Sequence, residues 1–236
     1  MSASAFLAGP LAQTDTQPLL RWEWVTDNID EIASRGAQHF WLTVVSVVVA
    51  LVIAFPLAVL AHRRRWVIQP ITWVSSLLYT IPALALISLL LPITGLSLTT
   101  VAIPLISYNL LIIFRNTLSG LDGVDDDVLY AARGMGFTER QVLWRVHVPL
   151  AMPVIIAGVR IATVSSIGLV TIAALIGRGG FGQFILLGMN TFFWTPLVVG
   201  VVLSVAFAFA ADLLLLGFQR LTMPWARGTG ARTVGT

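Results

Sequence analysis

The 236-residue chain is 57% hydrophobic and only 11% charged, with a mean hydropathy of +0.90. A soluble domain of this length would carry about a quarter charged residues, so the composition excludes a soluble protein and predicts a polytopic membrane protein. All 14 basic residues are arginines, which excludes a P-loop because that motif requires lysine. Cysteine is absent, which excludes disulfide and thiolate chemistry. The net charge is only +3 and no dense basic patch occurs, which argues against nucleic-acid binding.

The N-terminal region precedes the first hydrophobic run. Residues 1–17 lack the basic segment of a secretory signal peptide and are expected to have no regular structure. In residues 18–39, Trp22 and Trp24 stand beside aliphatic and acidic residues, and tryptophan favours the membrane–water interface. Two interpretations remain open: a helix on the membrane surface, or a helical extension of the first span.

Five apolar runs are candidates for membrane spans, each of which needs about 20 residues. They cover residues 40–61, 71–91, 98–114, 152–176 and 196–218. The third run is short, so it is expected either to cross the bilayer nearly upright or to lie in a locally thinned part of it. Pro82 and Pro104 are expected to kink the second and third spans, because proline is tolerated in a membrane helix when neighbouring groups satisfy the freed carbonyls.

A glycine-rich stretch, GRGGFGQFILLGMNTFFW, separates the fourth and fifth spans. Its apolar part is too short to cross a bilayer. We expect a flexible external turn followed by a re-entrant or interfacial helix. The glycines of this turn are Gly177, Gly179, Gly180 and Gly182.

The arginines near the span ends predict the orientation, because cytoplasmic loops are enriched in basic residues. Ten arginines fall on one side of the membrane and three on the other, with Arg160 set aside as intramembrane. The N-terminus is therefore expected outside, and residues 125–153 and the C-terminus in the cytoplasm.

Residues 125–153 form the most charge-dense stretch of the chain. Asp125 or Asp126 can cap a first helix, which is expected to stop at Gly134–Gly136. Thr138 and Gln141 have the spacing of a capping box, so a second helix is expected to begin there.

The second helix of this loop is expected to run to about His147, itself interpreted as a surface residue, and to be ended by the prolines at 149 and 153 before the fourth span. Val142, Leu143 and Val146 give this helix an apolar ridge with charged flanks. Such a ridge suits insertion into a groove of a partner protein.

The spacing of Ala131-Ala132, Gly136 and the segment 146–149 resembles the EAA loop of binding-protein-dependent ABC importer permeases. That pattern is Glu-Ala-Ala, three residues, Gly, nine residues, then two aliphatic positions flanking one residue, and Pro. Tyr130 stands where the family has Glu, so an ionic contact to the ATPase at this position is replaced by an apolar or hydrogen-bonded one. The residues assigned to the coupling loop are Tyr130, Ala131, Ala132, Gly136, Thr138, Gln141, Val142, Leu143, Val146 and Pro149.

The resemblance covers residues 37–219 and implies the all-α, five-helix core of a type I ABC importer, with an external or interfacial segment at 1–36 and a cytoplasmic tail at 220–236. The sequence from Gly158 to Ile185 and the segment 78–82 are similar to permeases that import osmoprotectants such as glycine betaine, choline, carnitine and proline betaine.

The resemblance also implies the partners and the location. It implies a second permease subunit, identical or different, two ABC ATPase subunits and an external solute-binding protein, in contact with lipid in the bacterial inner membrane. The chain itself is then no enzyme and holds no cofactor, because ATP and Mg²⁺ belong to the partner ATPase. The segment 138–147 would act as the coupling helix that moves with the ATPases.

Arg160 and Asp212 are the two charges inside predicted spans, each about 10–12 Å from the cytoplasmic boundary at 1.5 Å per residue. Charges at such depth are usually functional or paired, so we expect the two to form an ion pair between antiparallel spans. The alternative is that Arg160 extends to the headgroups while Asp212 pairs with Arg220 or faces a wet cavity.

Polar residues within the spans are candidates for lining the pathway, although most serine and threonine side chains in membrane helices bond their own backbone or a neighbouring helix. Two other functions remain open: import of another small solute, such as an amino acid or organosulfur compound, or a secondary transporter or channel that uses Arg160 and Asp212. The candidate lining residues are Ser75, Ser76, Tyr79, Thr80, Asn109, Thr163, Ser165, Ser166 and Thr171, with Tyr108 beside them.

Overall fold

The computed structural model describes residues 18–223, which are almost entirely helical, and no strand occurs among them. The predicted irregular segment 1–17 and all but the first four residues of the predicted tail lie outside the described residues. The helices are α1 Trp22–Asp27, α2 Ile29–Arg63, η2 Arg65–Val67, α3 Ile68–Thr80, α4 Ala83–Thr94, α5 Leu98–Asp122, α6 Asp126–Gly134, α7 Glu139–Val142, η3 Leu143–His147, α8 Val148–Ile172, η4 Ala173–Ile176, α9 Gly182–Thr191 and α10 Trp194–Thr222.

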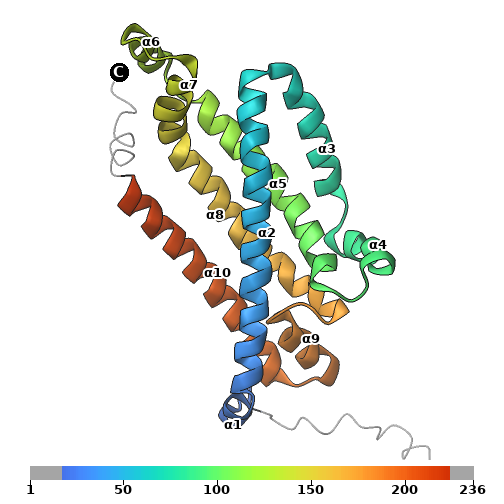
Figure 1. Cartoon of the computed structure of the whole chain (residues 1–236). Coiled ribbons are helices and arrows are strands. Elements are labelled where there is room, and N and C mark those ends of the chain that lie inside the picture. The colour runs from blue at the N-terminus through green and yellow to red at the C-terminus, as the bar shows by residue number, and fades with distance from the viewer. Residues whose placement is uncertain (1–17, 224–236) are drawn as a thin grey trace, which may run out of the picture.

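Four long helices, α2, α5, α8 and α10, form the body of the molecule (Figure 1). In the described part of the chain they are the helices long and apolar enough to span a membrane alone, and the bent pair α3–α4 gives a fifth crossing if it is one span. Helix α5 packs against α2 and α8, and α8 also packs against α10. Helices α6 and α7 lie at one end of the bundle, and α1 and α9 lie at the other (Figure 1).

The contact between α2 and α5 is built on small residues. The face of α2 toward α5 repeats alanine every three or four positions, and these alanines are fully buried with Ile113 and Phe114 of α5. Small side chains let membrane helices approach closely and gain van der Waals contact. The alanines are Ala50, Ala54, Ala58 and Ala61.

The second predicted span is broken. Helices α3 and α4 meet at an angle of 90°, with Ile81 and Pro82 in the extended connection between them. The Tyr108 hydroxyl donates a hydrogen bond to the Ile81 carbonyl, which satisfies a backbone group that the break exposes. The expectation of a kink at Pro82 is therefore confirmed, and the bend is sharp enough to divide the predicted span into two helices.

The third predicted span is longer than expected. Helix α5 has 25 residues and ends at Asp122 rather than near Arg115, so the expected short span is wrong. The Arg115 side chain reaches α3, where it donates a hydrogen bond to Ser76 Oγ at 3.2 Å. Pro104 is buried inside α5 without ending it.

The N-terminal region contains a helical extension of the first span and a separate short helix. Residues from Ile29 onward extend the first span, because α2 is continuous to Arg63. Helix α1 is separate, and its Trp24 ring stacks edge-on against Phe184 and Phe193 at centroid distances of 5.8 and 6.1 Å. These contacts hold α1 against α9 and the start of α10.

Candidate functional site

The first helix of the polar loop has the caps that its sequence predicts. Asp125 caps α6 by accepting a hydrogen bond from the Asp127 backbone N–H at 2.9 Å. The helix ends at Gly134, and Gly136 follows with φ +85°. An added Cβ at Gly136 would have open space around it, so the left-handed backbone, rather than crowding, requires glycine there.

The second helix begins with the predicted capping box. Gln141 Oε1 accepts hydrogen bonds from the Thr138 backbone N–H at 2.8 Å and from Thr138 Oγ1 at 3.1 Å, while Thr138 Oγ1 accepts from the Gln141 backbone N–H at 3.4 Å. Arg133 Nε donates to Glu139 Oε1 at 2.9 Å and links α6 to α7. This hydrogen bond raises the pKa of the Arg133 guanidinium, and the pair is too exposed to contribute much stability.

Replacing Gln141 with leucine is expected to destabilise the start of α7 by about 1 kcal/mol, because two hydrogen bonds to Thr138 are lost at an exposed site. The expected result is roughly fivefold faster amide hydrogen exchange in α7, measured by mass spectrometry on the full chain in lipid nanodiscs. Gln141→Glu keeps the acceptor and serves as the control. Equal exchange in the leucine and glutamate variants would contradict the role of the cap.

The apolar ridge of the loop points inward rather than toward a partner. Val142 is 1% exposed and packs on Leu129 and Ala132 of α6, and Leu143 is buried against the end of α5. The hypothesis that Val142 and Leu143 insert into a partner is therefore wrong, whereas Val146 is half-buried. The apolar side chains that α6 and its C-cap expose include Tyr130 at 68% and Met135 at 70%.

A π-helical turn, η3, joins α7 to α8 without a break, so helix continues from Glu139 to Ile176. The expectation that prolines end the coupling helix is wrong, because Pro149 lies in the first turn of α8, where proline is tolerated. His147 is buried, contrary to expectation, with Nδ1 3.3 Å from the Leu121 carbonyl. Its ring contacts that of His62, whose Nδ1 lies 2.6 Å from Asp122 Oδ1.

The intramembrane charges pair as predicted. Arg160 Nε and Nη2 each donate a hydrogen bond of 2.8 Å to a different oxygen of Asp212. This bidentate ion pair joins α8 to α10, and bidentate pairs are the strongest arginine–carboxylate contacts. The side chains remain 24% and 33% exposed within the chain, on helices that present apolar faces to the bilayer.

The predicted pathway residues do not form one group. Asn109 and Ser166 are buried and bond each other reciprocally at 2.7 and 3.0 Å, tying α5 to α8. Thr163 and Thr171 bond carbonyls of their own helix. Ser75 is buried, and Ser165 is half-buried.

The other three predicted residues, Ser76, Tyr79 and Thr80, lie on the exposed side of α3. A cavity of about 360 Å³ on this helix has a polar stripe at intervals of three or four residues, and aromatic Trp73 borders it. Sequence reasoning missed Gln69, Thr72 and Trp73. The helical spacing of the polar residues was the signal that could have found them. The lining residues are Gln69, Thr72, Trp73, Ser76, Leu77 and Thr80.

The glycine-rich turn is tightly packed, so a flexible turn is not what the structure shows. A Cβ on Gly179 would lie 2.2 Å from the Ala174 backbone nitrogen. The Phe181 backbone N–H donates to His39 Nδ1 at 3.4 Å, which leaves Nε2 to donate to the Ile167 carbonyl at 3.0 Å. His39 thereby holds the turn against α2 and α8, with the short helix α9 following as predicted.

Comparison with known proteins gives a consistent result. The family model described as "Binding-protein-dependent transport system inner membrane component" matches residues 39–223. The chain is 36% identical to the osmoprotectant import permease protein OsmW of Salmonella typhimurium, over 85% of this chain and 96% of that protein. It is 37% identical to the choline transport system permease protein OpuBD of Bacillus subtilis (89% and 94%) and 38% identical to the carnitine transport permease protein OpuCD of Listeria monocytogenes (79% and 84%).

Two solved structures share the fold. One is the MetNI methionine ABC transporter in an inward-facing conformation, with a TM-score of 0.70 at 20% identity over 82% of this chain and 97% of that one. The other is an amino acid ABC transporter crystallised with histidines, with a TM-score of 0.70 at 17% identity over 85% and 98%.

Proposed function

The chain belongs to the family of binding-protein-dependent transport system inner membrane components, and we propose that it forms the pathway through which an ATP-driven importer moves a quaternary-ammonium osmoprotectant. Glycine betaine, choline and carnitine are the solutes of this class. The observation that carries the substrate class is the 36–38% identity, over most of each chain, to permeases named for osmoprotectant, choline and carnitine transport. The solved methionine and amino-acid transporters are more distant in sequence and support the fold alone.

The proposed assembly contains a second permease subunit, two ATPase subunits and an external binding protein. ATP and Mg²⁺ are held by the ATPases, and this chain carries no catalysis. We place the α6–α7 end in the cytoplasm, as the arginine distribution predicts. The exposed Tyr130 and Met135 side chains offer the ATPase an apolar contact where the family pattern has a glutamate.

The proposed coupling runs from the loop into the membrane along one helix. Closure of the ATPases displaces α7, and the continuous helix from Glu139 to Ile176 passes this displacement to α8. Helix α10 follows α8 because Arg160 holds Asp212. The opening of the pathway thus alternates between the two sides of the membrane.

The proposed pathway runs along the polar stripe of α3. Its Gln69 and Thr80 side chains are exposed on a single subunit and its Thr72 and Ser76 side chains are half-buried. A surface that faces a second permease subunit across a solute path must be accessible in this way. Trp73 and Tyr79 add aromatic faces, which attract quaternary ammonium groups.

Uptake of radiolabelled glycine betaine by liposomes that contain the permease, its ATPase and its binding protein is expected to require ATP inside and to survive collapse of the proton gradient. The reason is that the energy comes from nucleotide hydrolysis on the partner. Excess choline or carnitine should compete, whereas methionine at the same concentration should not. Uptake that persists without ATP and disappears with the proton gradient would sink the proposal and favour a secondary transporter.

A further inference from the structure

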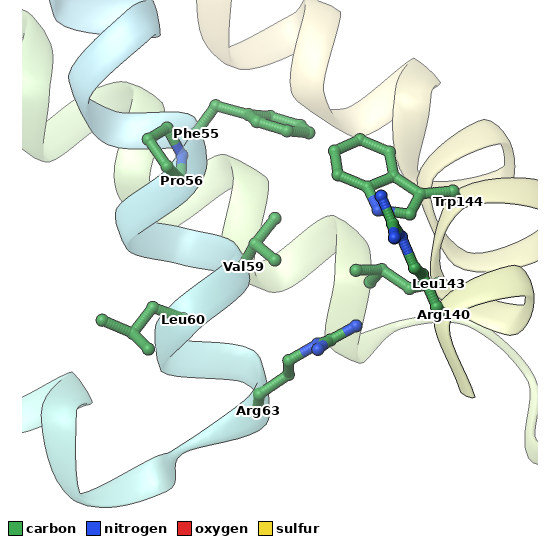
Figure 2. A pocket seen from close by; sticks show the side chains of 8 residues that line it. All are labelled: Phe55, Pro56, Val59, Leu60, Arg63, Arg140, Leu143 and Trp144. Carbon is green, nitrogen blue, oxygen red and sulfur yellow. The ribbon is translucent and has the colours of Figure 1, made fainter.

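A groove lies between α2 and the α7–η3 segment (Figure 2). It has a volume of about 390 Å³. Arg63 extends into it from the end of α2, and Arg140 faces it from α7, on the opposite wall. The remaining lining residues are apolar or aromatic: Phe55, Pro56, Val59, Leu60, Leu143 and Trp144.

The floor of this groove lies at bilayer depth. Phe55 precedes Arg63 by eight residues of continuous helix, a rise of about 12 Å at 1.5 Å per residue. One leaflet contributes about 15 Å of hydrocarbon, so the groove runs from the polar boundary well into the acyl region. Trp144 is half exposed and contacts Phe55 at a ring distance of 6.1 Å, a placement typical of the membrane–water interface.

Neither arginine of the groove has a hydrogen-bonded or ion-paired partner among the described residues. The lining of the groove includes these two arginines and no acid. Glu139 shares the neighbouring cavity with Arg63 and attracts its charge, but the Glu139 carboxylate is hydrogen-bonded to Arg133 and not to Arg63.

We propose that this groove binds one anionic phospholipid of the surrounding bilayer, with its phosphate between Arg63 and Arg140 and an acyl chain along the apolar floor. Two unpaired guanidinium groups provide the donors that a phosphodiester requires. A free phosphate would make no contact with the apolar floor. The surface of a folded partner protein would have to enter the hydrocarbon region to fill the groove. The bound lipid fastens the start of the coupling helix to α2.

The test counts lipids bound to the full chain by native mass spectrometry. Purified chain is titrated with dioleoylphosphatidylglycerol or dioleoylphosphatidylcholine, which have the same acyl chains. The anionic lipid is expected to bind about 30-fold more tightly, equivalent to about 2 kcal/mol at about 1 kcal/mol for each arginine. The double variant Arg63→Gln/Arg140→Gln should lose this preference.

The matched control is Arg64→Gln/Arg145→Gln, which removes the same number of charges from the same two helical ends. Both arginines are exposed and neither lines the groove, so the preference should persist. A second variant, Leu60→Trp, narrows the floor while keeping both arginines and should weaken binding of either lipid. If the double variant cannot be purified, the Leu60→Trp variant still tests whether lipid binds in this groove.

Four results would overturn the proposal. The first is an unchanged lipid preference in the Arg63→Gln/Arg140→Gln variant, and the second is an equal loss of preference in the control pair. The third is full competition by soluble glycerophosphoglycerol, which would identify a phosphate site that does not bind the acyl chain. The fourth is loss of ATPase capture by the double variant with lipid binding intact, which would identify an acidic protein surface as the occupant.

Discussion

Replacing Arg160 with alanine is expected to lower the thermal unfolding temperature and to abolish uptake. The substitution leaves the Asp212 carboxylate without the two 2.8 Å hydrogen bonds that now satisfy it. An unpaired charge within a membrane helix is unfavourable. Asp212→Ala should have a similar effect, because it leaves the guanidinium unpaired. Thermal unfolding of the full chain in nanodiscs measures the stability.

A double-mutant cycle separates the pair from the two side chains. Arg160→Met/Asp212→Leu removes both charges and is expected to be more stable than Arg160→Met or Asp212→Leu alone, since removing both partners leaves no unpaired charge. Leu213→Ala, a change at a lipid-exposed neighbour on α10, is the control and should have little effect. Strictly additive losses across the cycle would show that the two residues do not interact.

Replacing Gly136 with valine is expected to abolish capture of the ATPase while leaving membrane insertion intact. The backbone at Gly136 has φ +85°, a conformation that β-branched residues essentially do not adopt. The left-handed region costs about 1–2 kcal/mol for an ordinary side chain, so valine should re-aim α7 relative to α6. Co-purification of the partner ATPase with the tagged permease measures the loss.

Gly134→Val is the control for this change. It makes the same substitution two residues earlier, in the same loop, at a glycine whose backbone is helical and whose Cβ position is open. ATPase capture should be close to that of the unmodified chain. The assignment of the coupling loop fails if the Gly136 variant captures the ATPase normally, or if both variants lose it equally.

Local chemistry made the coupling loop predictable. The Asp125 cap and the Thr138–Gln141 box depend on neighbours within three residues, so the start of each helix could be located from the sequence. The Arg160–Asp212 pair could be predicted for a different reason. Two isolated charges at the same depth on antiparallel spans lower their free energy by pairing, and the depth of each follows from the helical rise per residue.

Tertiary contacts decided the features that the sequence did not reveal. The right-angled break after α3 depends on Tyr108, which lies 27 positions beyond the Ile81 carbonyl that it bonds. Hydropathy ended the third span at Arg115, but that side chain finds a partner on α3 and the helix continues. The direction of the ridge at Val142 could not be known without the position of α6, because a helix of two turns can bury its apolar side against its own loop or against a partner.

The π-helical turn at Leu143–His147 has a consequence for how α8 is set within the bundle. Its hydrogen bonds span five residues instead of four, so the turn holds one residue more than an α-helical turn. Returning it to α-helical bonding would rotate α8 by about 100° relative to the loop, at 3.6 residues per turn. The Arg160–Asp212 bond to α10 and the Asn109–Ser166 bond to α5 would both break in that rotation. They therefore hold α8 in one orientation about its axis.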